Sequence, residues 1–321
     1  MTVGHATDER CRTGVTTLLV DGFWSASVDV RGGGPGSRET EALAPENLVG
    51  RVHAIVLGGG SVFGLAAADG VTAALSASGR GLHLKPGAPA IPLVPAAVLH
   101  DLANGGDKQW GLEPPYRRLG QASVDAARTD FEQGRVGAGR GAMAGLIPGG
   151  IGSVSLDLGD GLMVGALVAA NPIGSVLMPD RHTYWAWPFE IGDEFGGIRP
   201  TGHPPVTDPL PDQSRLASLG RTQAGANTTL AVIACNADLS STECKRVAMM
   251  AHDGMARAVR PAHTPFDGDT VFALASGARP IGEGNARQVQ VGRIGSAAAD
   301  CLARAIARAV FIGGQQGLEP R

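Results

Sequence analysis

A hydroxyl residue, Thr228, stands where a proline-rich polar segment (199–226) meets an apolar run (230–235). If the bond between Asn227 and Thr228 is cut, Thr228 gains a free α-amine, whose ordinary pKa of about 7.7–8.0 suits a general base. Nucleophile and base then belong to one residue, which is how an N-terminal threonine activates its weakly nucleophilic hydroxyl. The boundary therefore predicts a self-cleaving precursor with its scissile bond between Asn227 and Thr228.

Two other interpretations of the tripeptide Asn227-Thr228-Thr229 remain open. It fits the N-glycosylation pattern, although nothing else in the sequence indicates secretion. A loop that enters a strand without any chemistry would also have this composition.

A second candidate site is the glycine run 58–60, which follows an expected strand and precedes a helix that Ser61 would cap. A dinucleotide fingerprint would need glycine or alanine at position 63, where Phe63 stands. A phosphate-binding loop would need Gly-Lys-Ser or Gly-Lys-Thr, which is absent here. Nucleotide binding is therefore the weaker interpretation, while free N–H groups at such a helix start can still bind an oxyanion.

Composition limits the class of protein. With 321 residues, 43% of them hydrophobic, the chain can bury a substantial core, and we expect one domain spanning residues 1–321. The net charge of −3 gives no reason to expect a nucleic acid or a membrane as partner. The cysteines lack metal or redox spacing and are expected as buried thiols, so we expect a cytoplasmic protein without metal or cofactor. They are Cys11, Cys235, Cys244 and Cys301.

The elements that must position Thr228 follow from the apolar pattern. Strands are expected at 14–20, 23–30, 54–57, 90–94, 152–158, 162–170, 230–235 and 270–275, and helices at 61–75, 123–132, 240–259 and 291–312. Asp21-Gly22 indicates a hairpin, and Ser240 with Glu243 forms a capping box. Strands that are apolar on both faces need a layer on each side, which favours an αββα sandwich.

Several motifs occur in the order found in DmpA-type self-processing aminopeptidases and, more closely, in 6-aminohexanoate-oligomer (nylon oligomer) hydrolases, which this sequence resembles. They are Leu57-Gly58-Gly59-Gly60-Ser61-x-Phe63-Gly64-Leu65, Gly134-Arg135-x-Gly137-Ala138-Gly139, Asn171-Pro172-x-Gly174, Gly225-Ala226-Asn227-Thr228-Thr229 and Pro261-x-His263-Thr264-x-x-Asp267-Gly268-Asp269. The resemblance implies an α+β fold, a four-layer αββα sandwich like that of N-terminal nucleophile hydrolases. It also implies cleavage into a larger subunit, 1–227, and a smaller one, 228–321, within a homo-oligomer of cleaved units.

The resemblance implies catalytic roles as well. Thr228 would attack the amide carbonyl of a small peptide or amide and form an acyl-enzyme. Asn171 would donate to the oxyanion, and Asp267 and Asp269 would orient Thr228 from one face of an extended segment. Taken alone, Asn171 also fits an Asn-Pro turn and the acidic pair fits a turn before a strand. A calcium loop would need ligands that are missing.

Three further residues are expected to bind substrate: Gly60, Phe63 and Leu146. Nylon-oligomer hydrolases have a lysine where Leu146 stands, related members have one at Pro148, and the family's tyrosine is Phe63 here. Either an arginine such as Arg140 replaces that lysine or the site works without a cation. A family member that never matures and serves as a ligand-binding or structural protein is therefore the alternative, and the amide substrate stays open among nylon oligomers, L-peptides, D-amides and β-peptides.

Overall fold

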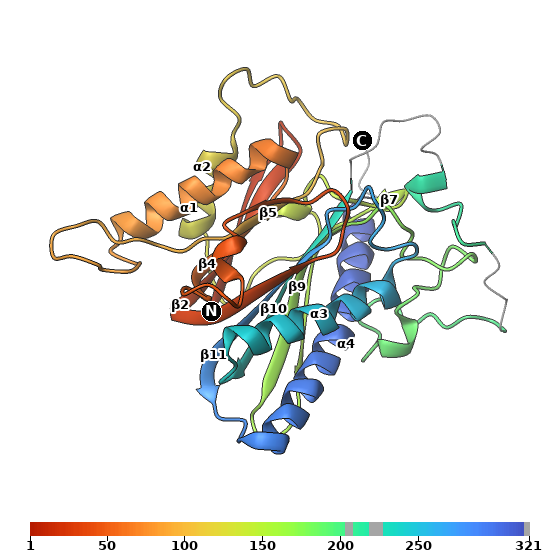
Figure 1. The fold of residues 1–321 in the computed structure, drawn as a ribbon. Coiled ribbons are helices and arrows are strands. Elements are labelled where there is room, and N and C mark those ends of the chain that lie inside the picture. The colour runs from red at the N-terminus through yellow and green to blue at the C-terminus, as the bar shows by residue number, and fades with distance from the viewer. Residues whose placement is uncertain (203–207, 218–226, 318–321) are drawn as a thin grey trace.

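The structure, a computed structural model, describes residues 1–202, 208–217 and 227–317 (Figure 1). Its main sheet has nine described strands in the order β3-β5-β4-β2-β11-β10-β9-β8, with β1 paired to β2. The strands are β1 (Thr2–Asp8), β2 (Thr13–Val30), β3 (Gly36–Arg38), β4 (Arg51–Gly58), β5 (Ala96–Val98), β8 (Gly150–Asp157), β9 (Met163–Asn171), β10 (Thr228–Ala237) and β11 (Thr270–Arg279); β6 (Met143–Ala144) and β7 (Ile147–Pro148) form a separate pair. The helices are α1 (Ala66–Ala77), α2 (Tyr116–Asp125), α3 (Ser241–Ala258) and α4 (Gly284–Gln316).

The predicted hairpin at Asp21-Gly22 is wrong, because these residues lie inside the single long strand β2. Gly22 has a φ of +76°, and the pairing of β2 with β4 shifts register between Leu19 and Trp24. A glycine with positive φ can produce a bulge that bends a strand as readily as a turn that reverses it. The first half of β2 pairs with β1 and the second half with β11, so β2 joins the two halves of the sheet.

Three buried cores separate four layers and confirm the αββα arrangement. One core lies between the two sheet halves and includes Leu57, Leu230 and Phe272. A second lies between α1, α2 and the N-terminal half, and a third lies between α3, α4 and the C-terminal half. In Figure 1 the two helix pairs accordingly lie on opposite sides of the strands. In β10, Leu230 faces the central core and Ala231 the helical core, as the two-sided apolar pattern predicts.

The helix starts differ from expectation in three places, one of them α4, which begins at Gly284 and not at the predicted 291. Ser61 does not cap a helix: its φ is +52°, it is the first residue of a 3-10 helix (Ser61–Leu65), and the N-cap residue of α1 is Leu65. Helix α2 lies N-terminal to the predicted 123–132. Gly120, in its interior, allows it to approach α1 closely, because a Cβ there would lie 2.1 Å from the Ala67 carbonyl oxygen. The capping box of α3 is present as predicted, with reciprocal Ser240 and Glu243 hydrogen bonds. None of the described helices is long and apolar enough to cross a membrane.

Candidate active site

Strand pairing brings the four predicted catalytic residues to one edge of the sheet. Thr228, the first residue of β10, lies directly opposite Asn171, the last residue of β9. Residues directly opposite each other in an antiparallel pair place their side chains on the same face, about 5 Å apart. β11 runs parallel to β10 and begins at Thr270, so the loop that carries Asp267 and Asp269 arrives at the same edge.

The peptide bond between Asn227 and Thr228 is buried and held by hydrogen bonds. Each of the two residues is only 4% exposed. The carbonyl oxygen of Asn227 accepts a hydrogen bond from the Thr228 hydroxyl and another, of 3.1 Å, from the Gly268 N–H. A Cβ on Gly268 would lie 2.6 Å from the Thr228 hydroxyl oxygen, so this approach requires glycine. The two groups that an intramolecular acyl shift would join, a hydroxyl and a polarised carbonyl, are therefore in contact.

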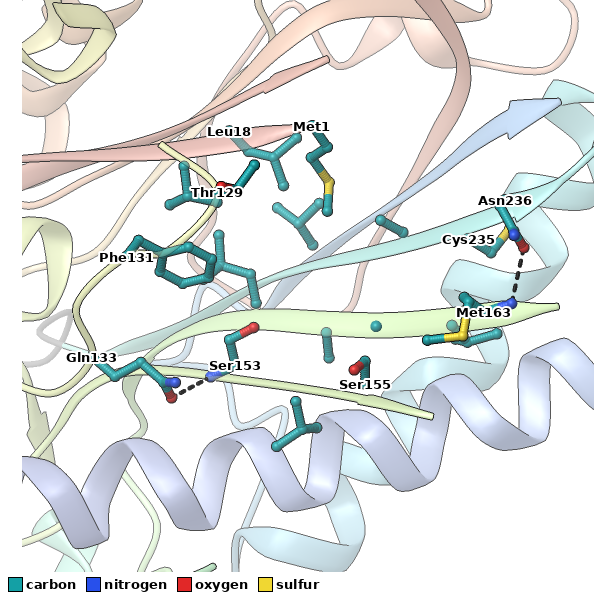
Figure 2. Close-up of a pocket in the computed structure, with 18 of the residues that line it drawn as sticks. Met1, Leu18, Thr129, Phe131, Gln133, Ser153, Ser155, Met163, Cys235 and Asn236 are labelled. Carbon is teal, nitrogen blue, oxygen red and sulfur yellow. Dashed lines mark hydrogen bonds between the residues drawn. The ribbon is translucent and has the colours of Figure 1, made fainter. Parts of the chain in front are cut away.

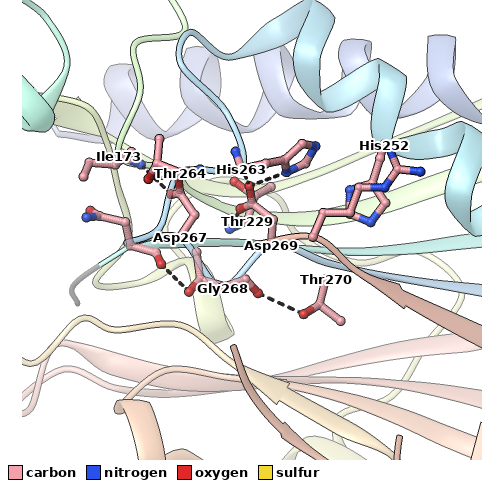
Figure 3. Close-up of polar contacts among 12 residues, drawn as sticks. Ile173, Thr229, His252, His263, Thr264, Asp267, Gly268, Asp269 and Thr270 are labelled. Atoms are coloured by element: carbon pink, nitrogen blue, oxygen red, sulfur yellow. Dashed lines mark hydrogen bonds and ion pairs between the residues drawn. The ribbon is translucent and has the colours of Figure 1, made fainter. Parts of the chain in front are cut away.

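Asp267 braces the backbone beside this bond. One of its oxygens accepts from the Ile173 N–H at 3.2 Å, and the other accepts from the N–H and the hydroxyl of Thr264 at 3.0 and 2.7 Å (Figure 3). Because Ile173 follows β9 and Thr264 precedes β11, the carboxylate ties the two segments together. Burial, and then the negative charge of Asp269, raises the pKa of Asp267 to about 6.

Asp269 holds the other side of the loop. It accepts from the Thr229 N–H at 2.8 Å and from the N–H and the ring Nδ1 of His263 at 3.1 and 2.8 Å. The ring of His252 meets that of His263 edge-on, with centroids 4.8 Å apart (Figure 3). His252 is fully buried, and burial lowers its pKa to about 4, so it is neutral at neutral pH. Sequence reasoning gave His263 no catalytic role, and its bond to Asp269 makes it a support of the acidic pair.

The raised pKa of Asp267 predicts a pH-dependent stability. Folding raises its pKa from 3.8 to about 6, so the protonated form favours the native state, and this contribution is complete below pH 3.8 and lost as pH rises through 6. A shift of about two units corresponds to about 3 kcal/mol. Asn does not titrate, so the free energy of unfolding of Asp267→Asn keeps this contribution constant. We expect its free energy of unfolding to rise relative to that of the parent by about this amount between pH 4 and 7. Thermal unfolding of both proteins in a Thr228→Ala background, which keeps the chains uncut, measures it; a pH-independent difference would contradict the assignment.

The side-chain amide of Asn171 has a fixed orientation. Its oxygen accepts from the Met143 N–H at 2.9 Å, and its Nδ2 donates to the His100 carbonyl at 3.3 Å. Since the Met143 N–H can bond only to the amide oxygen, Nδ2 must point to the other side, where its two hydrogens are donors. The arrangement suits a donor to a developing oxyanion.

Thr228 opens onto a pocket of about 330 Å³. Besides Thr228, the pocket is lined by small residues of loops, by aliphatic side chains and by one histidine: Gly34, Pro35, Gly36, Ser37, Ser61, Val62, Leu65, Val98 and His100. Burial lowers the pKa of His100, which favours a neutral ring at neutral pH. The loop after β2 thus contributes to the site, which the sequence analysis missed. The signal was the run Gly32-Gly33-Gly34, because a Cβ on Gly32 would lie 2.3 Å from the Asp267 carbonyl oxygen.

The three residues expected to bind substrate are not among this pocket's lining residues, although Gly60 and Phe63 adjoin Ser61 and Val62 in the chain. Phe63 is 44% exposed and its ring meets Trp110 edge-on, at 5.7 Å. Gly60 has a φ of +80° and donates its N–H to Asp101 at 2.8 Å. Leu146 is 55% exposed. Their contact with substrate stays a prediction.

Arg140, the arginine suggested from the sequence as a replacement for the family's lysine, does not line the Thr228 pocket. Arg140 pairs with Glu9 at 2.7 Å. A different arginine, Arg215, reaches the site from the proline-rich polar segment 199–226, and donates to the carbonyl oxygens of Asn171 and Pro172 at 3.3 and 3.0 Å. The segment has three arginines among prolines and polar residues, and nothing in its sequence singles out Arg215 for this contact.

A larger pocket, of about 530 Å³, lies away from Thr228 (Figure 2). Leu18, Phe131 and Met163 line it, and it extends to Cys235, seven residues along β10 from Thr228. Val232 is the lining residue of β10 nearest to Thr228, and at about 3.3 Å per strand residue it is roughly 13 Å from Thr228. Within the described ranges no group of three His, Cys, Asp or Glu residues could hold a metal ion.

Comparison with known proteins identifies the family. The sequence pattern of peptidase family S58 matches residues 1–316. The chain belongs to peptidase family S58. This S58 chain is 43% identical over 306 residues to an uncharacterized aminopeptidase of Mycobacterium tuberculosis, covering 93% of this chain and 85% of that protein. It is 31% identical over 292 residues to a 6-aminohexanoate-oligomer endohydrolase of Kocuria sp. strain KY2, covering 86% and 73%.

Solved structures agree on the fold of this S58 member. A Burkholderia sp. beta-aminopeptidase superposes with a TM-score of 0.64 at 23% identity, covering 96% of this chain and 83% of that one. An L-aminopeptidase D-Ala-esterase/amidase of Ochrobactrum anthropi, described as a variant of the Ntn hydrolase fold, gives 0.64 at 18% identity with the same coverage. The predicted resemblance and the Ntn-hydrolase-like αββα fold are confirmed, and the protein is a hydrolase of the aminopeptidase and amidase type.

Proposed function

We propose that this S58 member is a self-processing amide hydrolase whose nucleophile is Thr228, freed by cleavage of the bond to Asn227. The observation that carries the proposal is the hydrogen bonding of the Asn227 carbonyl oxygen, which accepts from both the Thr228 hydroxyl and the Gly268 N–H. The future nucleophile and an oxyanion donor already meet at the bond to be cut. The products would be residues 1–227 and 228–321.

Maturation proceeds by an acyl shift followed by hydrolysis. The Thr228 hydroxyl oxygen attacks the Asn227 carbonyl carbon, and its proton passes to the Thr228 nitrogen as the carbon–nitrogen bond breaks. The resulting ester between Asn227 and Thr228 is hydrolysed by water. This leaves a carboxylate on Asn227 and a free amine on Thr228, next to its own hydroxyl.

The mature site then repeats this chemistry on a substrate amide. The Thr228 amine takes the proton of the hydroxyl as the oxygen attacks the carbonyl carbon. Nδ2 of Asn171 donates to the oxyanion, and the leaving amine departs with the proton. Water hydrolyses the acyl-enzyme and restores Thr228. The substrate class is small peptides or peptide-like amides, including 6-aminohexanoate oligomers, and homo-oligomers of cleaved units are the expected assembly.

A screen of small amides tests the proposal. The panel holds L-, D- and β-alanine p-nitroanilides and the linear 6-aminohexanoate trimer, with released amine as the readout. Turnover of at least one compound, abolished together with self-cleavage by Thr228→Ala, is the expected result. Turnover by an uncut Thr228→Ala protein would overturn the mechanism.

A second candidate is a family member that never matures and acts as a binding protein. The observation that favours it is the presence of Leu146 and Pro148 at the positions where relatives carry lysine. An uncut wild-type chain with no turnover across the panel would support this candidate.

A further inference from the structure

The turn around Arg215 docks onto the active-site loops. Its backbone N–H donates to the Ile173 carbonyl at 2.9 Å, and the hydroxyl of Ser214 donates to the same oxygen at 3.2 Å. The Leu146 N–H donates to the Gln213 carbonyl at 3.2 Å. Residues 213–215 are therefore fixed between the segment that ends β9 and the loop after β6.

The guanidinium of Arg215 is a partly buried cation. Its Nη2 donates to the carbonyl oxygens of Met143, Pro172 and Asn171 at 2.8, 3.0 and 3.3 Å. Burial lowers its pKa to about 10 and the charge of Asp267 acts in the opposite direction, so Arg215 stays cationic at neutral pH.

These contacts connect Arg215 both to Asn171 and to the loop that holds Asp267. Arg215 fixes Met143, whose N–H in turn fixes the amide orientation of Asn171. It also fixes Ile173 through its backbone, and the Ile173 N–H binds the carboxylate of Asp267, the neighbour of Gly268. A shift of this segment would therefore move an oxyanion donor and the support of the scissile carbonyl together.

We propose that Arg215 is a positioning residue, which holds Asn171 with its donor toward the pocket and supplies a positive charge that faces Asp267. This inference rests on the proposed function and names a residue that it needs. Arg215 belongs to the 1–227 fragment, so the part of the chain that precedes the cut keeps a role in the mature site. Asp267 is faced by Asp269 from its own loop and by Arg215 from the 208–217 segment.

Self-cleavage tests the inference without any added ligand. Full-length wild type, Arg215→Met and Arg215→Lys are made by cell-free translation, and the uncut fraction is followed by intact mass from pH 5 to 9. Arg215→Met is expected to cleave about 10- to 100-fold more slowly, the cost typical of a small misplacement of reacting groups. Loss of the cation also shifts the acidic limb of its rate profile to higher pH, because Asp267 becomes harder to ionise. Arg215→Lys is expected to restore most of the cleavage rate and to return the acidic limb of the pH–rate profile to its wild-type position.

Arg140→Met is the matched control, since it removes a partly buried, ion-paired arginine outside the site and is expected to cleave at the wild-type rate. Melting temperatures confirm that each variant is folded. An Arg215→Met protein with the wild-type cleavage rate and the wild-type acidic limb would overturn the inference about Arg215 and leave the proposed function standing. A slower variant with an unchanged limb and no rescue by lysine would reduce Arg215 to a structural residue and also overturn it. A wild-type chain that never cleaves would instead remove the proposed function and this inference with it.

Discussion

A full-length Thr228→Ala protein is expected to remain one uncut chain and to lose amide hydrolysis by a factor of roughly 10⁴ or more, the scale at which enzymes lose rate with their nucleophile. The reason is that one hydroxyl serves both reactions: it lies against the Asn227 carbonyl in the precursor and would attack substrate in the mature enzyme. Intact mass and a p-nitroanilide assay on the same preparation measure both effects.

Two variants separate the loss of the nucleophile from damage to the fold. Thr228→Ser keeps a hydroxyl at the start of β10 and is expected to cleave itself. Thr229→Ala removes the neighbouring buried hydroxyl, which has no hydrogen-bond partner among the described residues, and is expected to cleave like the wild type. A Thr228→Ala chain that folds, stays uncut and still hydrolyses amides would contradict the assignment of the nucleophile.

Asn171→Asp is expected to lower kcat by about 10²–10³ with little change in KM, as the loss of one oxyanion donor does. The carboxylate can still accept from the Met143 N–H, so the local backbone contact survives while the donor is lost. Steady-state kinetics on the cleaved variant measure the effect.

Asn171→Ala is the companion variant, because it removes both the donor and the acceptor. If the oxyanion contact is what matters, the two variants lose similar amounts of kcat, and Asn171→Ala alone also loses stability through the unpaired Met143 N–H. A cleaved Asn171→Asp enzyme with wild-type kcat would show that Asn171 is only a turn residue.

The layered fold was predictable because its signals are local and strong. The run from Leu230 to Cys235 is apolar on both faces, and the structure buries it between the central and helical cores. The predicted strand 230–235 lies within β10, which begins two residues earlier, at Thr228. The hairpin at Asp21-Gly22 failed because a positive-φ glycine is compatible with a bulge as well as a turn, and only the long-range pairing of β2 with β11 decides between them.

The candidate site was predictable only where motif residues carry it. Asn171 and the acidic pair meet Thr228 through strand register, which a motif match implies but spacing alone does not. His100 and Arg215 were missed because their role comes from where their backbone lies: a carbonyl that orients Asn171 and a turn that docks on Ile173. Such contacts join residues more than 40 positions apart and leave no pattern in the sequence.

The intact mass of freshly purified wild-type protein under denaturing conditions tests the central claim most directly. The account predicts two species, whose masses match residues 1–227 and 228–321, with threonine as the N-terminal residue of the smaller one. A single species of 32.7 kDa that persists on incubation at neutral pH would contradict self-processing at Thr228 and leave the non-maturing binding protein as the better account.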